Sequence, residues 1–511
     1  MTAPVTANND ITTGGEKPMV KRLGVGWLVP ALLMFGCSGG GDPTPQVAAE
    51  EPVLDAAVVL ENVISAMGTA DVESITFSGT AWRVRNSFRQ TYSASPPWPE
   101  RDEITNYRRT LDLSQPASIA SGDTFAQNLF LEPPVAGTYS QHIPGDERAW
   151  GQQLEIWLTP WGFLAGAERN GVELETATVD GVDYTVLSWQ SPADQTAPSG
   201  LRYTVNGYVN AANLIERVET WVEDPFMGDM LVEARYAGYR DFAGVMVPTT
   251  MEQWRGGGAI FGVSVTDAVA NPVNLAELMT PPPRPAGGPG GGPAGGDAPA
   301  ELAERIGDGV WLIHGGYVAL VAEFSDHVLV FEAGQSEARG EQILAEVKRI
   351  LPEKPIRYVV NSHPHSDHTA GLVPFVREGV TIVTHENNID FLDMALSTPR
   401  TLLGEPALEP QFEGVGELGV FEDETMRVEL HHVPNLHSDG TLVAYVPKAK
   451  VLFQADFTLP REGARPNPFV VSLAEYVEQK GLDFERYFAV HAAPAPQTKA
   501  DLMAALAARE E

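Results

Sequence analysis

The pattern of apolar and polar positions divides the chain into two regions with different periods. From Val53 to Met67, apolar residues recur at helical spacing and the run stops at Gly68, which predicts one amphipathic helix. From Ile75 to about Val273, short aromatic-rich alternating runs are separated by Gly, Pro, Asn and Asp, which is typical of antiparallel strands joined by turns. A second helix is expected over Gln153 to Ala167, interrupted by Pro160.

The second region follows a low-complexity segment, Pro281 to Gly296, that is rich in proline and glycine. Because such a segment cannot pack a core, it marks a domain boundary. Beyond it, apolar strands alternate with amphipathic helices, which predicts a layered α/β domain. The expected strands are 310–313, 318–324, 327–331, 356–360, 381–384, 427–433, 441–446 and 451–453, and the expected helices are 337–351, 372–377, 472–479 and 498–508.

The net charge of the chain limits the classes of molecule that it can bind. The chain of 511 residues carries a formal charge of -34, and no run of Lys and Arg appears in it. Because polyanion binding needs clustered basic residues, this charge argues against nucleic acid and leaves a small-molecule substrate, neutral or cationic, as the expected partner.

The only cysteine, Cys37, closes an export-type segment. Two basic residues precede the apolar run Leu23 to Phe35, which Pro30 breaks and which is too short to span a membrane comfortably. An ending in Gly-Cys resembles the signal of bacterial lipoproteins, whose cysteine is acylated. That resemblance implies a membrane anchor at Cys37, and Ser38 after it favours the outer membrane, facing the periplasm. An ordinary signal peptide or an uncleaved anchor remains the alternative.

These boundaries give the following predicted organisation. The chain would consist of an upstream extension or misplaced start (1–18), an export signal (19–37), a tether (38–50), a β-rich antiparallel α+β domain (51–278), a Pro/Gly linker (279–300) and an α/β domain (301–511).

The strongest chemical signal is the segment Asn361-Ser-His-Pro-His-Ser-Asp-His, which directly follows the predicted strand 356–360. Ten of the eleven histidines lie after the linker, and this segment places His363, His365, Asp367 and His368 within six residues. Imidazole nitrogens and a carboxylate suit a borderline-soft divalent ion, zinc above all. One short loop of this kind can seed a two-metal site.

Three further residues at predicted strand ends could complete the site: His437, Asp456 and His491. Each follows an apolar run or joins two of them, which predicts a polar rim at one edge of the sheet. Of the other histidines of this region, His314, His327 and His385 are expected at strand ends or on the surface. His431 and His432 are adjacent on one strand and point to opposite faces, so at most one could line the site, and neither is included in it.

In order and spacing these seven residues resemble the metallo-β-lactamase superfamily, over roughly Ala303 to Glu511. The resemblance implies a four-layer αββα sandwich. It also implies that His363, His365 and His437 bind one metal ion, that Asp367, His368 and His491 bind a second, and that Asp456 bridges the two. Ser362 before the motif, Ser438-Asp439 after His437 and Ala492 after His491 depart from the usual residues, which leaves the pocket shape and the substrate open.

The resemblance further implies a dinuclear zinc hydrolase, with iron or manganese as alternative metals. A water held between the two ions would be the nucleophile, and Asp367 would orient it and pass on its proton. Because lactam-cleaving members generally lack an acid at the place of Asp456, ester, lactone or thioester bonds rank above lactams.

The rival hypothesis is a lipid- or ligand-binding protein of the cell envelope with a structural metal site. It draws on a weaker similarity of the β-rich domain, a helix followed by a long antiparallel sheet, to lipoprotein-carrier folds.

Overall fold

The computed structural model describes residues 55–84, 101–128, 131–145, 149–281, 302–459, 466–491 and 497–507. The predicted export signal with Cys37, the tether and nearly all of the Pro/Gly linker therefore lie outside the described residues. In the part of the chain that is described, no helix is both long and apolar enough to cross a membrane.

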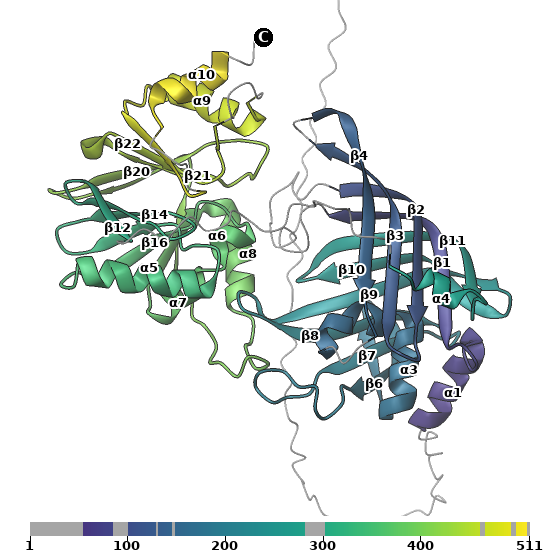
Figure 1. The fold of residues 1–511 in the computed structure, drawn as a ribbon. Helices are drawn as coiled ribbons and strands as arrows, with labels where there is room; N and C mark the ends of the chain where they lie inside the picture. The colour runs from purple at the N-terminus through teal and green to yellow at the C-terminus, as the bar shows by residue number, and fades with distance from the viewer. Residues whose placement is uncertain are drawn as a thin grey trace, which may run out of the picture. The chain divides into compact units, whose positions relative to one another are not determined.

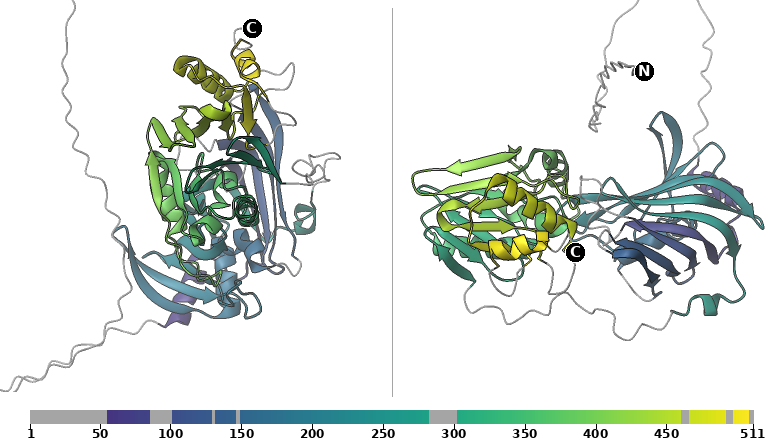
Figure 2. Two further views of the ribbon diagram at one scale, coloured as in Figure 1. Left: turned by 90° about the vertical axis from the view of Figure 1, so that its left-hand side faces the viewer. Right: turned by 90° about the horizontal axis from the view of Figure 1, so that it is seen from above.

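The β-rich domain is one eleven-stranded antiparallel sheet in the order β4-β3-β2-β1-β11-β10-β9-β8-β7-β6-β5. The sheet is strongly curved (Figure 1, Figure 2). Its strands are β1 (Ser74–Val84), β2 (Arg101–Asp112), β3 (Ala117–Asn128), β4 (Leu131–Ile143), β5 (Glu173–Val179), β6 (Val182–Gln190), β7 (Thr204–Val209), β8 (Ile215–Asp224), β9 (Gly228–Phe242), β10 (Val245–Arg255) and β11 (Gly258–Ala270).

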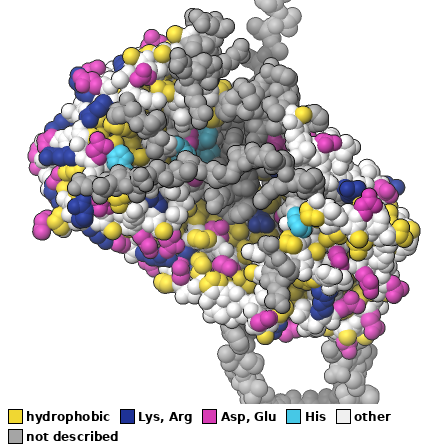
Figure 3. Space-filling view, viewed as in Figure 1, with side chains coloured by type: hydrophobic (Ala, Val, Ile, Leu, Met, Phe, Trp, Pro, Cys, Tyr) yellow, Lys and Arg dark blue, Asp and Glu magenta, His cyan; other side chains and the backbone are white. Residues whose placement is uncertain are grey.

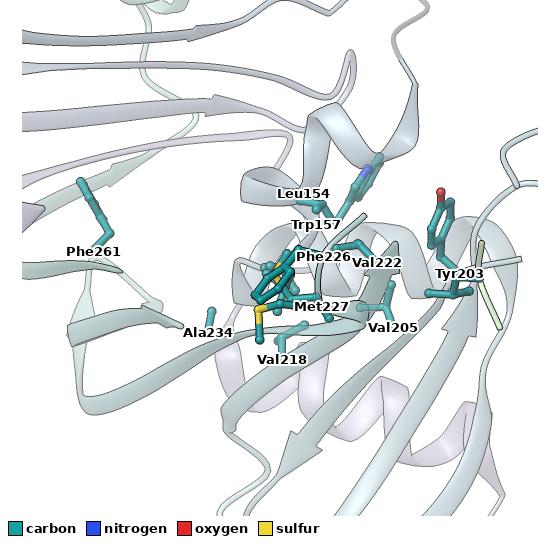
Figure 4. Packing of buried hydrophobic residues seen from close by; sticks show 14 of the residues in the cluster. Leu154, Trp157, Tyr203, Val205, Val218, Val222, Phe226, Met227, Ala234 and Phe261 are labelled. Carbon is teal, nitrogen blue, oxygen red and sulfur yellow. The ribbon is translucent and has the colours of Figure 1, made fainter. Parts of the chain in front are cut away.

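Helices pack against this sheet. The helix α1 (Ala56–Met67) is capped by Asp55, whose side chain accepts from the backbone N–H of Ala57, and ends at Gly68 in the left-handed conformation. The expected break at Pro160 is confirmed: α2 (Leu154–Trp157) ends before it, and α3 (Pro160–Asn170) begins on it as the first helical residue. Aromatic and aliphatic side chains from α2 and the strands form the core (Figure 4). A short helix, α4 (Leu275–Leu278), follows the sheet.

The first and last strands of the domain, β1 and β11, are neighbours. Their ends are joined by Asn271, whose side chain accepts from the backbone N–H groups of Glu73 (2.9 Å) and Ser74 (3.1 Å) and donates to the carbonyl of Asp71 (2.6 Å). The chain therefore enters and leaves the sheet at the same place.

The C-terminal domain contains two sheets. The first has seven strands: β12 (Ala303–Gly307), β13 (Val310–Ile313), β14 (Ala319–Glu323), β15 (Val328–Phe331), β16 (Ile356–Val360), β17 (Thr381–His385) and β18 (Phe412–Val415). The second has five: β19 (Leu418–Glu422), β20 (Arg427–His432), β21 (Leu442–Val446), β22 (Val451–Gln454) and β23 (Arg486–Ala489).

Three groups of buried side chains hold this domain together. One contains residues from both sheets, such as Leu320 and Phe453, so the two sheets face each other. The other two lie between a sheet and its helices: α5 (Glu337–Ile350), α7 (Leu372–Arg377) and α8 (Glu386–Leu396) belong to the first sheet, and α9 (Pro468–Lys480) and α10 (Lys499–Ala507) belong to the second (Figure 1). The alternation of strands with helices that the sequence predicts is present in the described part of this domain.

Several elements were not predicted. In the β-rich domain the sequence analysis named none of β2 to β6, β10 and β11, and in the C-terminal domain it omitted β12, β18, β19 and α8. The helix α9 begins at Pro468, four residues before its predicted start, because Asn467 caps it by accepting from the backbone N–H of Val470.

Acidic side chains are spread over the face seen in Figure 3 and are not gathered into one patch.

Candidate metal centre

The histidine-rich loop leaves the end of β16 and is fixed from within. Asn361 donates from its side chain to the carbonyl of His368 (3.0 Å), and Thr369 donates to the carbonyl of His365 (3.1 Å). The backbone N–H of Leu442, at the start of β21, donates to the carbonyl of Ser362 (2.8 Å), which ties the loop to the second sheet. Asn361, Ser362 and His363 are fully buried, so the loop conformation is set by packing as well as by these bonds.

The three downstream residues come from strand ends of the second sheet. His437 lies between β20 and β21 in a turn where the Asn435 side chain accepts from the backbone N–H of His437 (2.8 Å). Asp456 follows β22, and His491 follows β23, which pairs in parallel with β22. Because the carboxyl ends of parallel neighbours meet at one edge of a sheet, Asp456 and His491 are brought together.

All seven predicted residues meet in two adjoining groups. Ligand atoms of His363, His365, His437 and Asp456 lie within 4.8 Å of one another, and so do those of Asp367, His368 and His491. Asp456 links the groups: one of its oxygens lies 2.9 Å from His363 Nε2, 3.1 Å from His437 Nε2 and 3.2 Å from His368 Nε2, and the other lies 2.5 Å from His491 Nε2.

The spacing of these atoms fits a metal ion. His363 Nε2 lies 3.0 Å from His365 Nδ1 and 3.1 Å from His437 Nε2. Ligands arranged tetrahedrally at zinc distances stand about 3.3 Å apart, so three nitrogens already occupy roughly the corners that a zinc ion requires. Burial, with the neighbouring His368, lowers the pKa of His363 to about 4, and burial lowers the pKa of His365 well below its usual value. Both rings are therefore neutral at pH 7, the form that ligates metal.

Two of the rings are oriented by hydrogen bonds on their far sides. Ser362 Oγ lies 3.0 Å from His363 Nδ1, and a carboxylate oxygen of Glu332 lies 2.9 Å from His368 Nδ1. In both rings Nε2 is thereby turned toward the group, as is usual for metal-ligating histidines held by an outer carboxylate or hydroxyl.

Glu332 is a site residue that the sequence analysis missed. It is fully buried, its second oxygen accepts from the backbone N–H of Ser362 (3.0 Å), and its φ of 82° is rare for a residue with a side chain. It stands directly after the apolar strand β15, as Asp456 stands just after β22. The same pattern of an acid after an apolar run would have found it.

Tyr317 was missed as well. Its hydroxyl donates to Asp367 Oδ2 (2.8 Å), and its ring centre lies 4.6 Å from that of His491. Burial and the charge of Asp367 raise the pKa of this phenol above its usual value. In the sequence only the preceding Gly315-Gly316 indicated a turn here, and nothing indicated a contact with the metal loop.

The loop that carries His437 is held by the unpredicted helix α8. Asn388 donates to the carbonyl of Gly440 (2.9 Å), and the side chain of Asn387 donates to Asp439 Oδ2 (2.6 Å). A Cβ atom at Gly440 would stand 2.4 Å from Asn388 Oδ1, so any larger residue would have to displace the Asn388 side chain.

The remaining histidines of this domain lie outside the two groups. His431 is buried beside Tyr476 and Glu429, and His432 is on the other side of β20, where its ring centre lies 4.1 Å from that of His385. His314 contacts Glu304, and His327 stacks on Phe324. Of these, His385 is the last residue of β17 and His327 directly precedes β15, so both lie at strand ends.

A sequence model described as the metallo-beta-lactamase superfamily matches residues 314–505. By this match residues 314–505 form a region of the metallo-β-lactamase superfamily type, a class whose members are generally hydrolytic. It is joined to a β-rich N-terminal domain with a large antiparallel sheet.

Among individual proteins, the alpha subunit of 2,4-dinitroanisole O-demethylase from Nocardioides sp. (strain JS1661) is 25% identical over 202 residues, 38% of this chain. The chain spans 58% of that relative's length. Solved structures similar to the chain include a metallo-beta-lactamase from Pontibacter korlensis, with 18% identity, a TM-score of 0.32 and coverage of 41% of this chain and 98% of that one. Another is the metallo-beta-lactamase DIM-1, with 14% identity and a TM-score of 0.33; the match covers 42% of this chain and 99% of that one.

Proposed function

We propose that the protein is an exported, metal-dependent hydrolase that cleaves ester, lactone or thioester bonds. The observation that carries the proposal is the convergence of seven side chains in two adjoining groups. Asp456, one of the seven, links the groups by approaching four imidazoles through its two oxygens. Their nitrogen and oxygen donors suit two zinc ions, with iron or manganese as alternatives.

In this proposal His363, His365 and His437 hold the first ion, Asp367, His368 and His491 hold the second, and Asp456 is shared. When bound, a zinc pair supplies Lewis acidity and an acidic water at neutral pH. The chain's own residues do the rest. Glu332 and Ser362 keep the rings of His368 and His363 turned inward. Asp367 orients the attacking water and takes up its proton.

The exposure of the ligands supports a catalytic site over a structural one. The side chains of His363 and His368 are fully buried, whereas Asp367 is 25% exposed and His491 is 29% exposed. The second group therefore opens to solvent, and open coordination positions distinguish catalytic from structural zinc sites.

The rival function is an envelope lipid or ligand carrier. In the described part of the β-rich domain, the cavity beside Arg109 and Tyr236 measures about 20 Å³, room for about one water molecule. Two further pockets of this domain, beside Tyr184 and beside Pro272, measure about 490 and 400 Å³, which is the size of a ligand site. Experiment therefore has to separate the two functions. A carrier would retain lipid on purification and keep its function after His365→Ala.

Hydrolysis is tested with the purified soluble form, residues 38 onward, on chromogenic esters, lactones, thioesters and nitrocefin. The name of the Nocardioides relative adds 2,4-dinitroanisole, an aryl methyl ether, as a second candidate substrate. We expect about two zinc ions per chain and ester hydrolysis that His365→Ala abolishes. Full activity after chelator treatment would reject the proposal, and nitrocefin turnover above ester turnover would favour a β-lactamase.

The proposed address, an outer-membrane lipoprotein facing the periplasm, rests on Cys37 and Ser38 in the sequence. Expression with labelled palmitate and membrane fractionation tests it. Label should enter the wild-type chain and not Cys37→Ser. Equal release of both proteins into the soluble fraction would show an ordinary cleaved signal instead.

A further inference from the structure

The open side of the metal centre carries a hydroxyl that the ligand set does not use. Tyr317 donates to Asp367 Oδ2, the same oxygen that lies 3.6 Å from His368 Nε2 and 3.8 Å from His491 Nε2. The phenol therefore stands beside the more exposed group of ligands, where a substrate must enter. Its ring lies against His491 and His368, with centres 4.6 and 5.6 Å apart.

The backbone of Tyr317 is held firmly from two directions. Arg339, only 3% exposed, donates to the Tyr317 carbonyl from Nε (3.1 Å) and Nη2 (2.8 Å), and Nη2 also donates to the carbonyl of Ile313 (2.7 Å). On the other side the N–H of Val318 donates to the carbonyl of Val490, the residue before His491 (2.9 Å). Because the backbone of Tyr317 is fixed in this way, only its side chain has to turn for the hydroxyl to reach a reactant on which charge develops.

We infer that Tyr317 is a catalytic residue whose hydroxyl leaves Asp367 during turnover and donates a hydrogen bond to the leaving oxygen of the substrate. This inference rests on the proposed ester hydrolysis. In that reaction water adds to the acyl carbon, the bond from that carbon to the leaving oxygen breaks, and a proton from the water ends on the leaving oxygen. The O–H bond of Tyr317 stays intact and stabilises the negative charge on that oxygen until the proton arrives.

This role predicts a dependence on the leaving group that a structural tyrosine would not show. A nitrophenolate carries its own negative charge well, whereas an alkoxide depends on a donor. Loss of one such donor costs roughly 10- to 100-fold in rate when the charge is localised. Tyr317→Phe should therefore slow alkyl acetates by about 10- to 100-fold and 4-nitrophenyl acetate by only about two- to threefold.

The test compares kcat/KM of wild type, Tyr317→Phe and Tyr445→Phe on 4-nitrophenyl, phenyl, trifluoroethyl and ethyl acetate. Tyr445 is the matched control, because its hydroxyl donates to the Asp483 carbonyl (2.7 Å) and it lies in β21, three residues beyond the Leu442 contact with the metal loop. Zinc content of each variant and the affinity for a phosphonate monoester, a stable mimic of the charged transition state, give readouts that do not depend on turnover.

We expect unchanged zinc content, weaker phosphonate binding and a rate loss that grows along the series in Tyr317→Phe alone. An equal loss on all four esters, no loss, or loss of zinc would overturn the inference, because each would show that the hydroxyl only positions Asp367 or does nothing. A wild-type enzyme inert on every ester would instead reject the proposed function.

Discussion

Glu332→Gln provides a sharp test of how the metal centre is oriented. The carboxylate accepts two hydrogen bonds, from the backbone N–H of Ser362 and from His368 Nδ1. A glutamine has one carbonyl oxygen, and the buried Ser362 N–H requires it. The amide NH₂ would then face His368 Nδ1. That nitrogen must become an acceptor, so the ring proton moves to Nε2, the atom turned toward Asp456 and unable to ligate once protonated.

The expected size of the effect follows from that geometry. Losing an outer carboxylate of this kind weakens metal binding by about 10- to 100-fold, or about 1.4 to 2.7 kcal/mol. Only the affinity for the second ion should fall, because Glu332 does not contact the side chains of the first group, His363, His365 and His437. Zinc competition against a chromogenic chelator resolves the two affinities.

The matched control is Glu346→Gln. Glu346 is a buried carboxylate (8% exposed) on α5 that pairs with Arg349 at 2.7 and 2.9 Å and makes no contact with the metal ligands. The Glu346→Gln variant should have a lower free energy of unfolding than wild type and an unchanged zinc affinity. If Glu332→Gln bound both ions as tightly as wild type, the orienting role of Glu332 would be wrong.

Three further outcomes are expected. Asp456→Asn should reduce bound zinc from about two ions to one or fewer by elemental analysis, and two retained ions would contradict the sharing of Asp456. Gly440→Ala should cost about 1 to 3 kcal/mol in thermal unfolding and weaken zinc binding, because its methyl group meets Asn388; unchanged unfolding would contradict the close contact. Glu155→Gln should cost roughly 3 kcal/mol by breaking the buried pair with Arg109 (2.9 Å). Burial opposes ionisation of Glu155, but the charge of Arg109 outweighs burial and lowers the pKa of Glu155. The stabilisation from this pair is therefore present above the unfolded carboxyl pKa of about 4.3, and it is lost as the pH falls through the lower folded pKa. Unfolding midpoints of wild type and variant that stayed apart at pH 2 would refute this pH dependence.

The chemistry of the site could be predicted because it is encoded locally. Metal ligands are recognisable residue types placed directly after apolar strands, so His363, Asp456 and His491 stand out in the sequence itself. Glu332 follows the same rule, because it stands directly after β15. Tyr317 could not be found this way, because its contact with Asp367 depends on a turn held by Arg339, a residue whose role appears only in three dimensions.

The elements that were missed share a different cause. The strand β3 contains Ser, Gly, Asp and Asn, which disfavour strands in isolation, and it is stabilised by pairing with β2 and β4. The helix α8 begins with Glu386-Asn-Asn and is stabilised by the burial of side chains such as Phe391 and Leu392. In both cases tertiary contacts override weak local preference, and the sequence pattern does not record those contacts.

The adjacency of β1 and β11 has a consequence for how the protein is made. Residues 75 to 84 find their partner strand only when residues 258 to 270 have left the ribosome, because Ile75 pairs with Ala270. Until then the first strand lacks a neighbour on one side, and closing so long a loop is slow. The eleven-stranded sheet is therefore complete only after residue 270 has been synthesised, although hairpins such as β8–β9 can pair earlier.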